Sequence, residues 1–345
     1  MTWTAISTAD NLQFVADDGD PEGTYYCYLT KEIGAPSYSF TFRGAKNVVL
    51  CLNGHTITGA EDSSKHDITV EEGKTFTLCD CGGEGQIIQV SQYSQGGVKV
   101  EGGAFNMYGG TITRTAASST DMIGVCVSGG TEGETAYTGT FNLYGGAITA
   151  SIGGGVYVTP YNSTFTMSGD VTITGNKVCV ADNNVYLPSN KTITIGAALG
   201  TGAKIGVITS GDPTSGNPIQ IATDATNEQL DYTKIFTPDV KDKGYTITKD
   251  GATLYLSTHE HSWEYSVGAD DATTISATCK DTTCTSRNGG MVTISKPRHT
   301  VYGDGKTADA TVAKSTWVAD AVSEITYKNY TGDNTPPPHR SHRCR

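Results

Sequence analysis

From about Val98 onward the chain repeats short segments in which apolar and polar residues alternate. Alternation with a period of two predicts short β-strands that bury one face and expose the other. Glycine and asparagine separate the segments, where the chain must turn with positive φ. The recurring apolar positions are Val98, Val100, Phe105, Met107 and Ile112, then Val125, Val127, Phe141, Leu143 and Ile148, then Val156, Val158, Phe165, Met167 and Ile173, and finally Val185, Leu187, Ile193 and Ile195.

Earlier segments follow the same scheme, so the repeat begins by about residue 40. Three short strands in each unit cannot bury their apolar faces alone, and they become stable when successive turns stack into one core. The pattern therefore predicts an all-β fold, a parallel β-helix. The earlier positions expected to face inward are Val48, Leu50, Leu52, Ile57, Ile68, Val70, Phe76 and Leu78.

Several of these runs also resemble a known class of proteins. LNGHTITG, GGVYV, TFTMSG and NVYLPSNKTITIG resemble repeats in large secreted adhesin-like proteins of gut Firmicutes, which carry right-handed parallel β-helices. The segments HEHSWEYSV, ISATCKDTTC and MVTISKP are similar to the small Ig-like β modules that follow such helices. The resemblance implies an extracellular protein of the bacterial cell surface, in which the module looks like a spacer.

These observations predict four regions. Residues 1–40, rich in aromatic side chains such as Trp3, Phe14 and Tyr26, are expected to cap the open end of the β-helix. Residues 41–257 form the right-handed parallel β-helix, and residues 258–332 form the small Ig-like module, a β-sandwich. The last residues, 333–345, concentrate Pro, His and Arg and are expected to be a disordered or artificial tail.

Charge and hydrophobicity exclude two classes of binding partner. The net charge of -12 repels nucleic-acid phosphates and anionic lipids. No apolar run reaches the roughly 20 residues that span a bilayer, and the first residues lack the features of a signal peptide. We therefore expect neither nucleic-acid binding nor membrane insertion, and we expect the export signal and the anchor to lie outside this sequence.

Parallel β-helices also occur among polysaccharide lyases and glycoside hydrolases, so the fold alone does not exclude catalysis. A lyase needs a basic side chain near carboxylates, yet the repeats contain only Arg43 and Arg114, in different units. A hydrolase needs two carboxylates about 5–10 Å apart, whereas the outward positions are mostly Thr, Asn, Ser and Tyr. We expect a non-enzymatic protein without a cofactor. A β-helical lyase or hydrolase and a purely structural stalk are the alternatives.

A host or microbial glycan or glycoprotein is the expected ligand. Tyr108 and Tyr144 follow matching residues, so they should stack outward on consecutive turns, with Tyr157 and Tyr161 one turn further on. Exposed aromatic rings suit sugars, but stacking that only reinforces the sheet is the interpretation we favour from the sequence alone. An insertion, TEGETAYTG, is the second candidate surface. It contributes Glu132, Glu134 and Tyr137.

The nine cysteines suggest disulfides. Aligning Leu50 with Leu78 places Cys51 and Cys79 on neighbouring strands, where Cα atoms lie about 4.8 Å apart and a disulfide is geometrically allowed. In the C-terminal module, a disulfide between Cys279 and Cys284 would stabilise a small domain. The alternative there is a zinc site, for which the ligands would be His259, His261, Cys279 and Cys284.

Overall fold

The computed structural model separates the chain into two compact units. The first contains Met1–Val240 and Tyr245–Thr258, and the second contains Lys241–Gly244 and His259–Arg343. The residues that the structure describes are 2–18, 22–34, 38–45, 47–60, 66–90, 96–114, 122–132, 135–214, 216–227, 230–241, 243–259, 263–267, 274–280, 288–293, 298–303 and 306–311.

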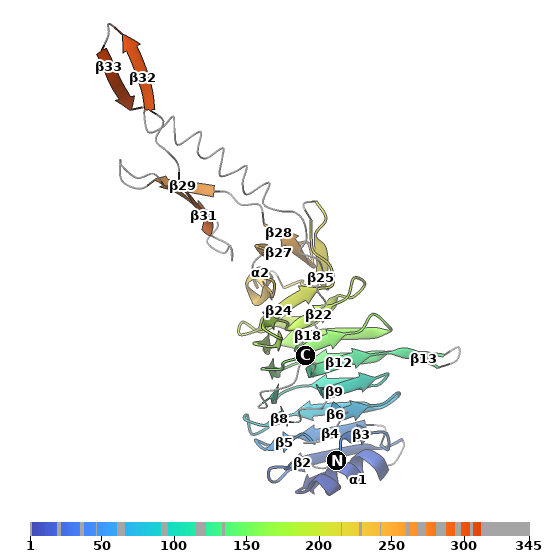
Figure 1. Cartoon of the computed structure of the whole chain (residues 1–345). Coiled ribbons are helices and arrows are strands. Elements are labelled where there is room, and N and C mark those ends of the chain that lie inside the picture. The colour runs from blue at the N-terminus through green and yellow to red at the C-terminus, as the bar shows by residue number, and fades with distance from the viewer. Residues whose placement is uncertain are drawn as a thin grey trace. The chain divides into compact units, whose positions relative to one another are not determined.

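The first unit is a parallel β-solenoid of about six turns, which confirms the predicted fold (Figure 1). Each turn contributes one strand to each of three stacks, which we call faces 1, 2 and 3. Face 1 contains β3 (Phe40–Phe42), β6 (His66–Val70), β9 (Gly96–Glu101), β12 (Ile123–Ser128), β17 (Val156–Val158) and β22 (Val185–Leu187). Face 2 contains β4 (Asn47–Cys51), β7 (Thr75–Cys79), β10 (Ala104–Met107), β15 (Gly139–Leu143), β18 (Ser163–Gly169) and β23 (Ile193–Leu199). Face 3 contains β5 (Thr56–Thr58), β8 (Gln86–Gln89), β11 (Thr111–Arg114), β16 (Gly146–Thr149), β19 (Val171–Thr174) and β24 (Lys204–Thr209).

Equivalent residues of successive repeats are register partners, so like side chains stack in the core. Phe76, Phe105, Phe141 and Phe165 follow one another on face 2, with ring centroids 5.4, 5.1 and 5.0 Å apart. Phe42 of face 1 extends this stack at 4.5 Å from Phe76. Every apolar position that the repeats predict to face inward is at most 3% exposed, which confirms the predicted core.

The corner between faces 3 and 1 holds a row of buried polar side chains that the repeat pattern did not predict. Each one lies beside a glycine, where an added Cβ would come within 2.2–3.0 Å of the polar side chain. Glycine is required at these positions because any side chain would displace a buried polar group. The pairs are Asp67 with Gly59, Gln89 with Gly97, Ser151 with Gly124, Asn176 with Gly155, and Asn184 with Gly206.

In the later turns this row is a continuous hydrogen-bond network. Asn176 accepts from the Ser151 amide at 3.0 Å and donates to the Ile148 carbonyl at 2.9 Å and to Oδ1 of Asn184 at 3.0 Å. Asn184 donates its amide N–H and its side-chain Nδ2 to the Asp239 carboxylate, each at 2.6 Å. The network satisfies polar groups that would otherwise be buried without partners.

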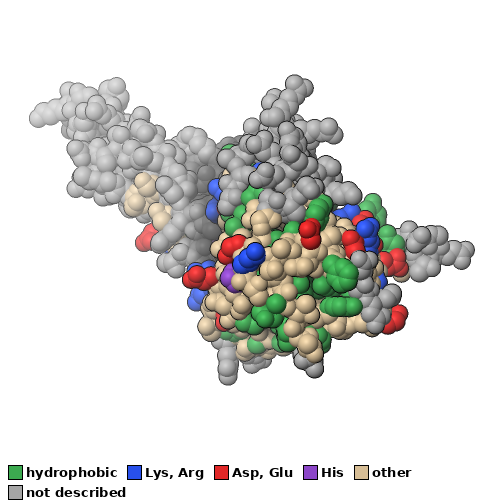
Figure 2. All heavy atoms as spheres, turned by 90° about the horizontal axis from the view of Figure 1, so that it is seen from below, with side chains coloured by type: hydrophobic (Ala, Val, Ile, Leu, Met, Phe, Trp, Pro, Cys, Tyr) green, Lys and Arg blue, Asp and Glu red, His purple; other side chains and the backbone are tan. Residues whose placement is uncertain are grey.

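The N-terminal end begins with β1 (Trp3–Ile6), α1 (Ala9–Asp18) and β2 (Thr24–Leu29). β2 pairs in parallel with β4 and β1 pairs in parallel with β2, so both strands extend face 2. Helix α1 covers this end with Leu12, Val15 and Ala16, whereas Phe14 is 59% exposed. Aliphatic residues of a helix therefore provide the cover that was expected from aromatic side chains. Figure 2 views this end and shows hydrophobic side chains scattered among polar and charged ones.

The other end of the first unit departs from the parallel pattern. β25 (Ile219–Thr223) continues face 2, and an antiparallel pair, β27 (Tyr245–Asp250) and β28 (Thr253–Thr258), adds to its edge. β26 (Phe236–Pro238) follows the short helix α2 (Tyr232–Ile235) and pairs with β24. A short antiparallel pair, β20 (Lys177–Val178) and β21 (Ala181–Asp182), joins β19 to β22.

The second unit contains antiparallel strands among its described residues. β29 (Trp263–Val267), β30 (Thr274–Cys279) and β31 (Asn288–Thr293) form one sheet. β32 (Arg298–Gly303) and β33 (Lys306–Thr311) form a hairpin. The Ig-like topology stays a prediction, and the predicted tail, 333–345, lies outside the described residues.

Candidate binding surface

The insertion in the second repeat forms a hairpin of β13 (Gly130–Glu132) and β14 (Thr135–Tyr137) between β12 and β15. The hairpin leaves the solenoid at the corner between faces 1 and 2 and projects to the side of the stacked turns (Figure 1). Glu132 belongs to β13, whereas Glu134 lies outside the described residues. The described residues of the predicted loop thus form a two-stranded hairpin that projects from the solenoid.

The base of the hairpin is held by the next turn of the solenoid. The Gly129 amide donates to the Tyr161 carbonyl at 3.3 Å, and Nδ2 of Asn162 donates to the Gly130 carbonyl at 3.3 Å. The Tyr137 ring packs against Gly102 and Gly130, where a Cβ on either glycine would overlap it. The Tyr137 ring therefore packs between the base of the hairpin and the preceding turn of the solenoid, so only part of the ring can contact a ligand.

Tyr161, in the turn between β17 and β18, has the most exposed aromatic ring in this region, at 69%. Beside it, Tyr157 stacks on Tyr186 with ring centroids 5.2 Å apart and an angle of 16° between the planes. The pKa of Tyr157 is raised by burial first, and then by nearby groups that include Tyr186 and Tyr161. We call Tyr137, Tyr157, Tyr161, Tyr186 and the β13–β14 hairpin the hairpin corner.

Sequence reasoning missed Tyr186 in this group. The sequence does indicate it, because Val156–Tyr157–Val158 and Val185–Tyr186–Leu187 are similar segments of successive repeats. The first two positions of these segments are register partners on neighbouring turns. The same likeness shows that the middle tyrosine of each triplet points outward while its neighbours are buried.

Tyr108 and Tyr144 stack as the repeats predict, with centroids 4.6 Å apart, and Tyr108 is 57% exposed. They follow strands β10 and β15, at the far end of face 2 from the hairpin. Asn106 and Asn142 lie two residues before them and are linked by a 2.8 Å hydrogen bond. The predicted tyrosines therefore occupy two separate places, and only Tyr157, Tyr161 and the hairpin meet at one corner.

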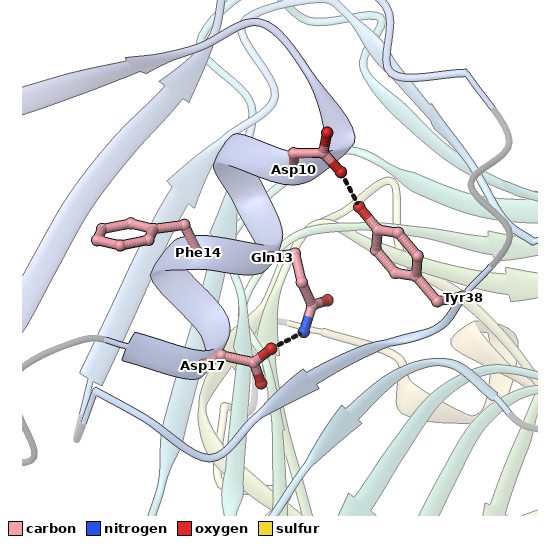
Figure 3. Close-up of a pocket in the computed structure, with 5 residues that line it drawn as sticks. All are labelled: Asp10, Gln13, Phe14, Asp17 and Tyr38. Atoms are coloured by element: carbon pink, nitrogen blue, oxygen red, sulfur yellow. Dashed lines mark hydrogen bonds between the residues drawn. The ribbon is translucent and has the colours of Figure 1, made fainter.

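A shallow hollow of about 260 Å³ lies on α1 at the N-terminal end, lined by Asp10, Gln13, Phe14, Asp17 and Tyr38 (Figure 3). The Tyr38 hydroxyl donates to Asp10 at 2.7 Å, and burial, followed by this carboxylate, raises the pKa of Tyr38 to about 12. Asp17 accepts from Gln13 and pairs with Arg43 at 2.9 Å. Both carboxylates thus take part in contacts that tie α1 to the segment around β3.

The cysteines divide between the units. Cys51 and Cys79 are register partners, as the alignment predicts, and both carry unbridged thiols. The sulfur of Cys51 lies 2.8 Å from that of Cys81, a residue that the sequence reasoning did not consider although the run Cys79–Asp80–Cys81 was visible. In the second unit, Nε2 of His259 lies 3.1 Å from Sγ of Cys279. His261 and Cys284, the other expected ligands, lie outside the described residues.

Comparisons with protein-family models, with curated proteins and with solved structures found no match. Within the described part of the chain, no helix has the length and apolar character needed to cross a bilayer. The fold and the geometry of its surface therefore carry the functional interpretation.

Proposed function

We propose that the chain is a non-enzymatic binding module of an extracellular bacterial surface protein, and that it recognises a glycan or glycoprotein at the hairpin corner. The observation that supports this most directly is the exposed ring of Tyr161 beside a hairpin whose base is hydrogen-bonded to the same turn. Recognition sites are commonly loops held by a rigid scaffold, and the stacked solenoid is such a scaffold.

The chemistry of this corner suits a sugar. A tyrosine ring covers the apolar face of a pyranose, and its hydroxyl bonds to the sugar's own hydroxyl groups. The turn around Tyr161 also carries the polar side chains of Thr159 and Asn162. Because the chain has a net charge of -12, a neutral sugar is a better partner than a polyanion such as a uronate polymer.

The non-enzymatic part of the proposal rests on the outward positions of face 2. Register partners along this face present threonine and asparagine, which cannot act as general acid or base at neutral pH. These outward residues are Thr77, Asn106, Asn142, Thr166 and Thr194. A β-helical lyase or hydrolase remains the alternative function, and product formation from a polysaccharide, abolished by one Asp or Glu substitution, would identify it.

The extracellular location rests on the resemblance of the repeats to secreted adhesin-like proteins. A purely structural stalk is the third function to test. It has the same fold but no ligand of its own, so a binding measurement separates it from the proposed module.

The test is a glycan array and a mucin pull-down with the full chain and three variants. Tyr161→Ala removes the exposed ring. A shortened hairpin, in which Asn-Gly replaces 131–136, keeps Gly130 opposite Tyr137 and supplies a two-residue turn. Tyr108→Ala is the matched control, because it removes a similarly exposed ring from the other end of face 2.

We expect the wild type and Tyr108→Ala to bind the same glycans and the two hairpin-corner variants to bind at least about 10-fold more weakly, as for loss of a central aromatic contact. Equal binding by all four proteins would place the ligand elsewhere. No binding by the folded wild type would favour the stalk.

A further inference from the structure

Three cysteine thiols converge outside the hairpin corner, on the first turns of the solenoid. Cys51 ends β4, Cys79 ends β7 on the next turn, and Cys81 lies two residues further along. Their sulfur atoms all lie within 4.8 Å of one another, and those of Cys51 and Cys81 are 2.8 Å apart. Stacking of the repeats accounts for the first two, since they are register partners. It does not account for the third.

The backbone holds Cys81 in place through its neighbour Asp80. The Asp80 carboxylate accepts hydrogen bonds from the amides of Gly54 at 2.7 Å, Gly85 at 2.7 Å and Gly82 at 3.3 Å. The turn after β7 is thereby fastened to the turn after β4. A side chain at Gly82 would collide with the backbone of Gly54, so this close approach needs glycine. The result is that Cys81 is fixed over Cys51.

A backbone donor also faces the sulfur of Cys51. The Cys81 amide donates a hydrogen bond to Sγ of Cys51 at 3.2 Å. The Asp80 oxygens accept hydrogen bonds from backbone amides, and the side chains that could hold a metal here are all cysteines. Sulfur is therefore the only donor type in this group of described side chains.

We propose that Cys51, Cys79 and Cys81 form a three-thiolate site for a thiophilic d¹⁰ cation such as Zn²⁺ or Cu(I). Soft thiolate ligands select such cations over Mg²⁺ or Ca²⁺. With a metal–sulfur distance of about 2.3 Å, three sulfur atoms in tetrahedral positions lie about 3.8 Å apart. To reach that geometry, the sulfur atoms of Cys51 and Cys81 have to move about 1 Å further apart than the 2.8 Å that now separates them.

The exposure of the three thiols agrees with this assignment. Cys51 is buried, Cys79 is half-buried and Cys81 is exposed, so a cation can enter past Cys81. A cation that binds these thiols displaces their protons. A disulfide, by contrast, would use two sulfur atoms and leave the third unpaired.

The experiment titrates the full chain with Cd²⁺ and with Zn²⁺ in a non-thiol reductant. It records the sulfur-to-cadmium charge-transfer absorption, the metal retained after desalting, and the protons released. Cysteine and histidine side chains elsewhere in the chain can also take up added metal, so the measured result is the difference between variants. Cys81→Ser removes an exposed ligand without disturbing the core. Cys126→Ser, a half-buried outward thiol on β12, is the matched control.

We expect the wild type and Cys126→Ser to retain one more equivalent of metal than Cys81→Ser. The affinity of the Cys81→Ser site should fall more than about 100-fold, because even the loss of a residue behind a ligand costs about 10- to 100-fold. The metal should also raise the melting temperature of the wild type but not that of Cys81→Ser. Equal metal content and equal charge-transfer absorption in the wild type and Cys81→Ser would overturn the proposal. So would a Cys51–Cys81 or Cys51–Cys79 disulfide in protein prepared with metal and without oxidant.

Discussion

Phe105 lies between Phe76 and Phe141, with ring centroids 5.4 and 5.1 Å away and planes within 9° of parallel. Its ring is completely buried. Repeats place the same residue type at the same register position, so neighbouring aromatic rings contact each other along the core. Each such contact contributes about 0.5–1.5 kcal/mol beyond simple burial.

Phe105→Ala should therefore lower the free energy of unfolding by about 3–5 kcal/mol, since it opens a cavity between two rings that cannot close the gap. Urea denaturation followed by circular dichroism measures this change. The control is Thr164→Ala at an exposed position on the same face, which should stay within about 0.5 kcal/mol. A loss below about 1 kcal/mol for Phe105→Ala would mean that the stack contributes little.

Asp67 is a buried acid at the corner between faces 3 and 1, and burial raises its pKa from 3.8 to about 8. Between these two values the folded chain keeps the proton that the unfolded chain releases. The stability that results from this difference in pKa is thus fully present below about pH 4. As the pH rises toward about 8, the free energy of unfolding falls by up to about 1.4 kcal/mol per pH unit.

Asp67→Asn should remove this pH dependence, so the stability of the variant relative to the wild type should increase from about pH 5 to about pH 8. The neighbouring His66 has a pKa lowered to about 4 by burial, which gives an opposite slope at acidic pH. Because both proteins contain His66, the difference between their urea unfolding free energies isolates Asp67. A difference that does not change with pH would contradict the assignment.

At the scale of strands and turns, the corner between faces 3 and 1 distinguishes this solenoid from a simple stack of alternating strands. A glycine on one strand makes space for a polar side chain from another, and the later turns are joined through Asn176, Asn184 and Asp239. These side chains satisfy backbone groups at a point where the chain leaves face 3 and enters face 1. The corner therefore sets how one turn continues into the following turn.

Asn176→Ala should destabilise the chain by at least about 2 kcal/mol, because it leaves the Ser151 amide and the Ile148 carbonyl without this partner in a buried setting. Denaturant titration gives the value. Asn190→Ala is the matched control, since Asn190 is exposed and makes one long hydrogen bond, to the Pro160 carbonyl at 3.4 Å. Similar effects of the two substitutions would show that the network is dispensable.

At the scale of the first unit, each turn contacts mainly the turns on either side of it. Stability in such a fold is close to a sum of terms from neighbouring repeats, so a local change need not unfold distant turns. The two ends are covered differently, by α1 at one end and by the antiparallel strands β27 and β28 at the other.

Leu12→Asp, which buries a charge between α1 and the first turn, should weaken hydrogen-exchange protection in β1, β2 and β4 and leave β22 and β23 close to the wild type. Mass spectrometry of exchanged peptides measures the pattern. Phe14→Asp, on the exposed side of the same helix, should leave protection unchanged. Uniform loss of protection along the chain in Leu12→Asp would mean that the solenoid unfolds as one cooperative unit.

The sequence by itself determined the repeating strands, the residues that face inward and the pairing of equivalent positions. Period-two alternation specifies which side chains are buried, and stacked repeats align like with like, as for Phe105 with Phe141 and Cys51 with Cys79. The stacking of Tyr108 on Tyr144 followed from the same rule.

Only the tertiary structure decided which side chains meet across turns. The turns vary in length and carry no period, so the position of Cys81 over Cys51 and of Tyr161 beside the hairpin depends on how those turns pack. The helix that covers the N-terminal end and the buried polar side chains between faces 3 and 1 also depend on how non-equivalent segments pack. Alternation describes contacts along a strand and between equivalent strands, whereas these contacts form between non-equivalent segments that the folded backbone brings together.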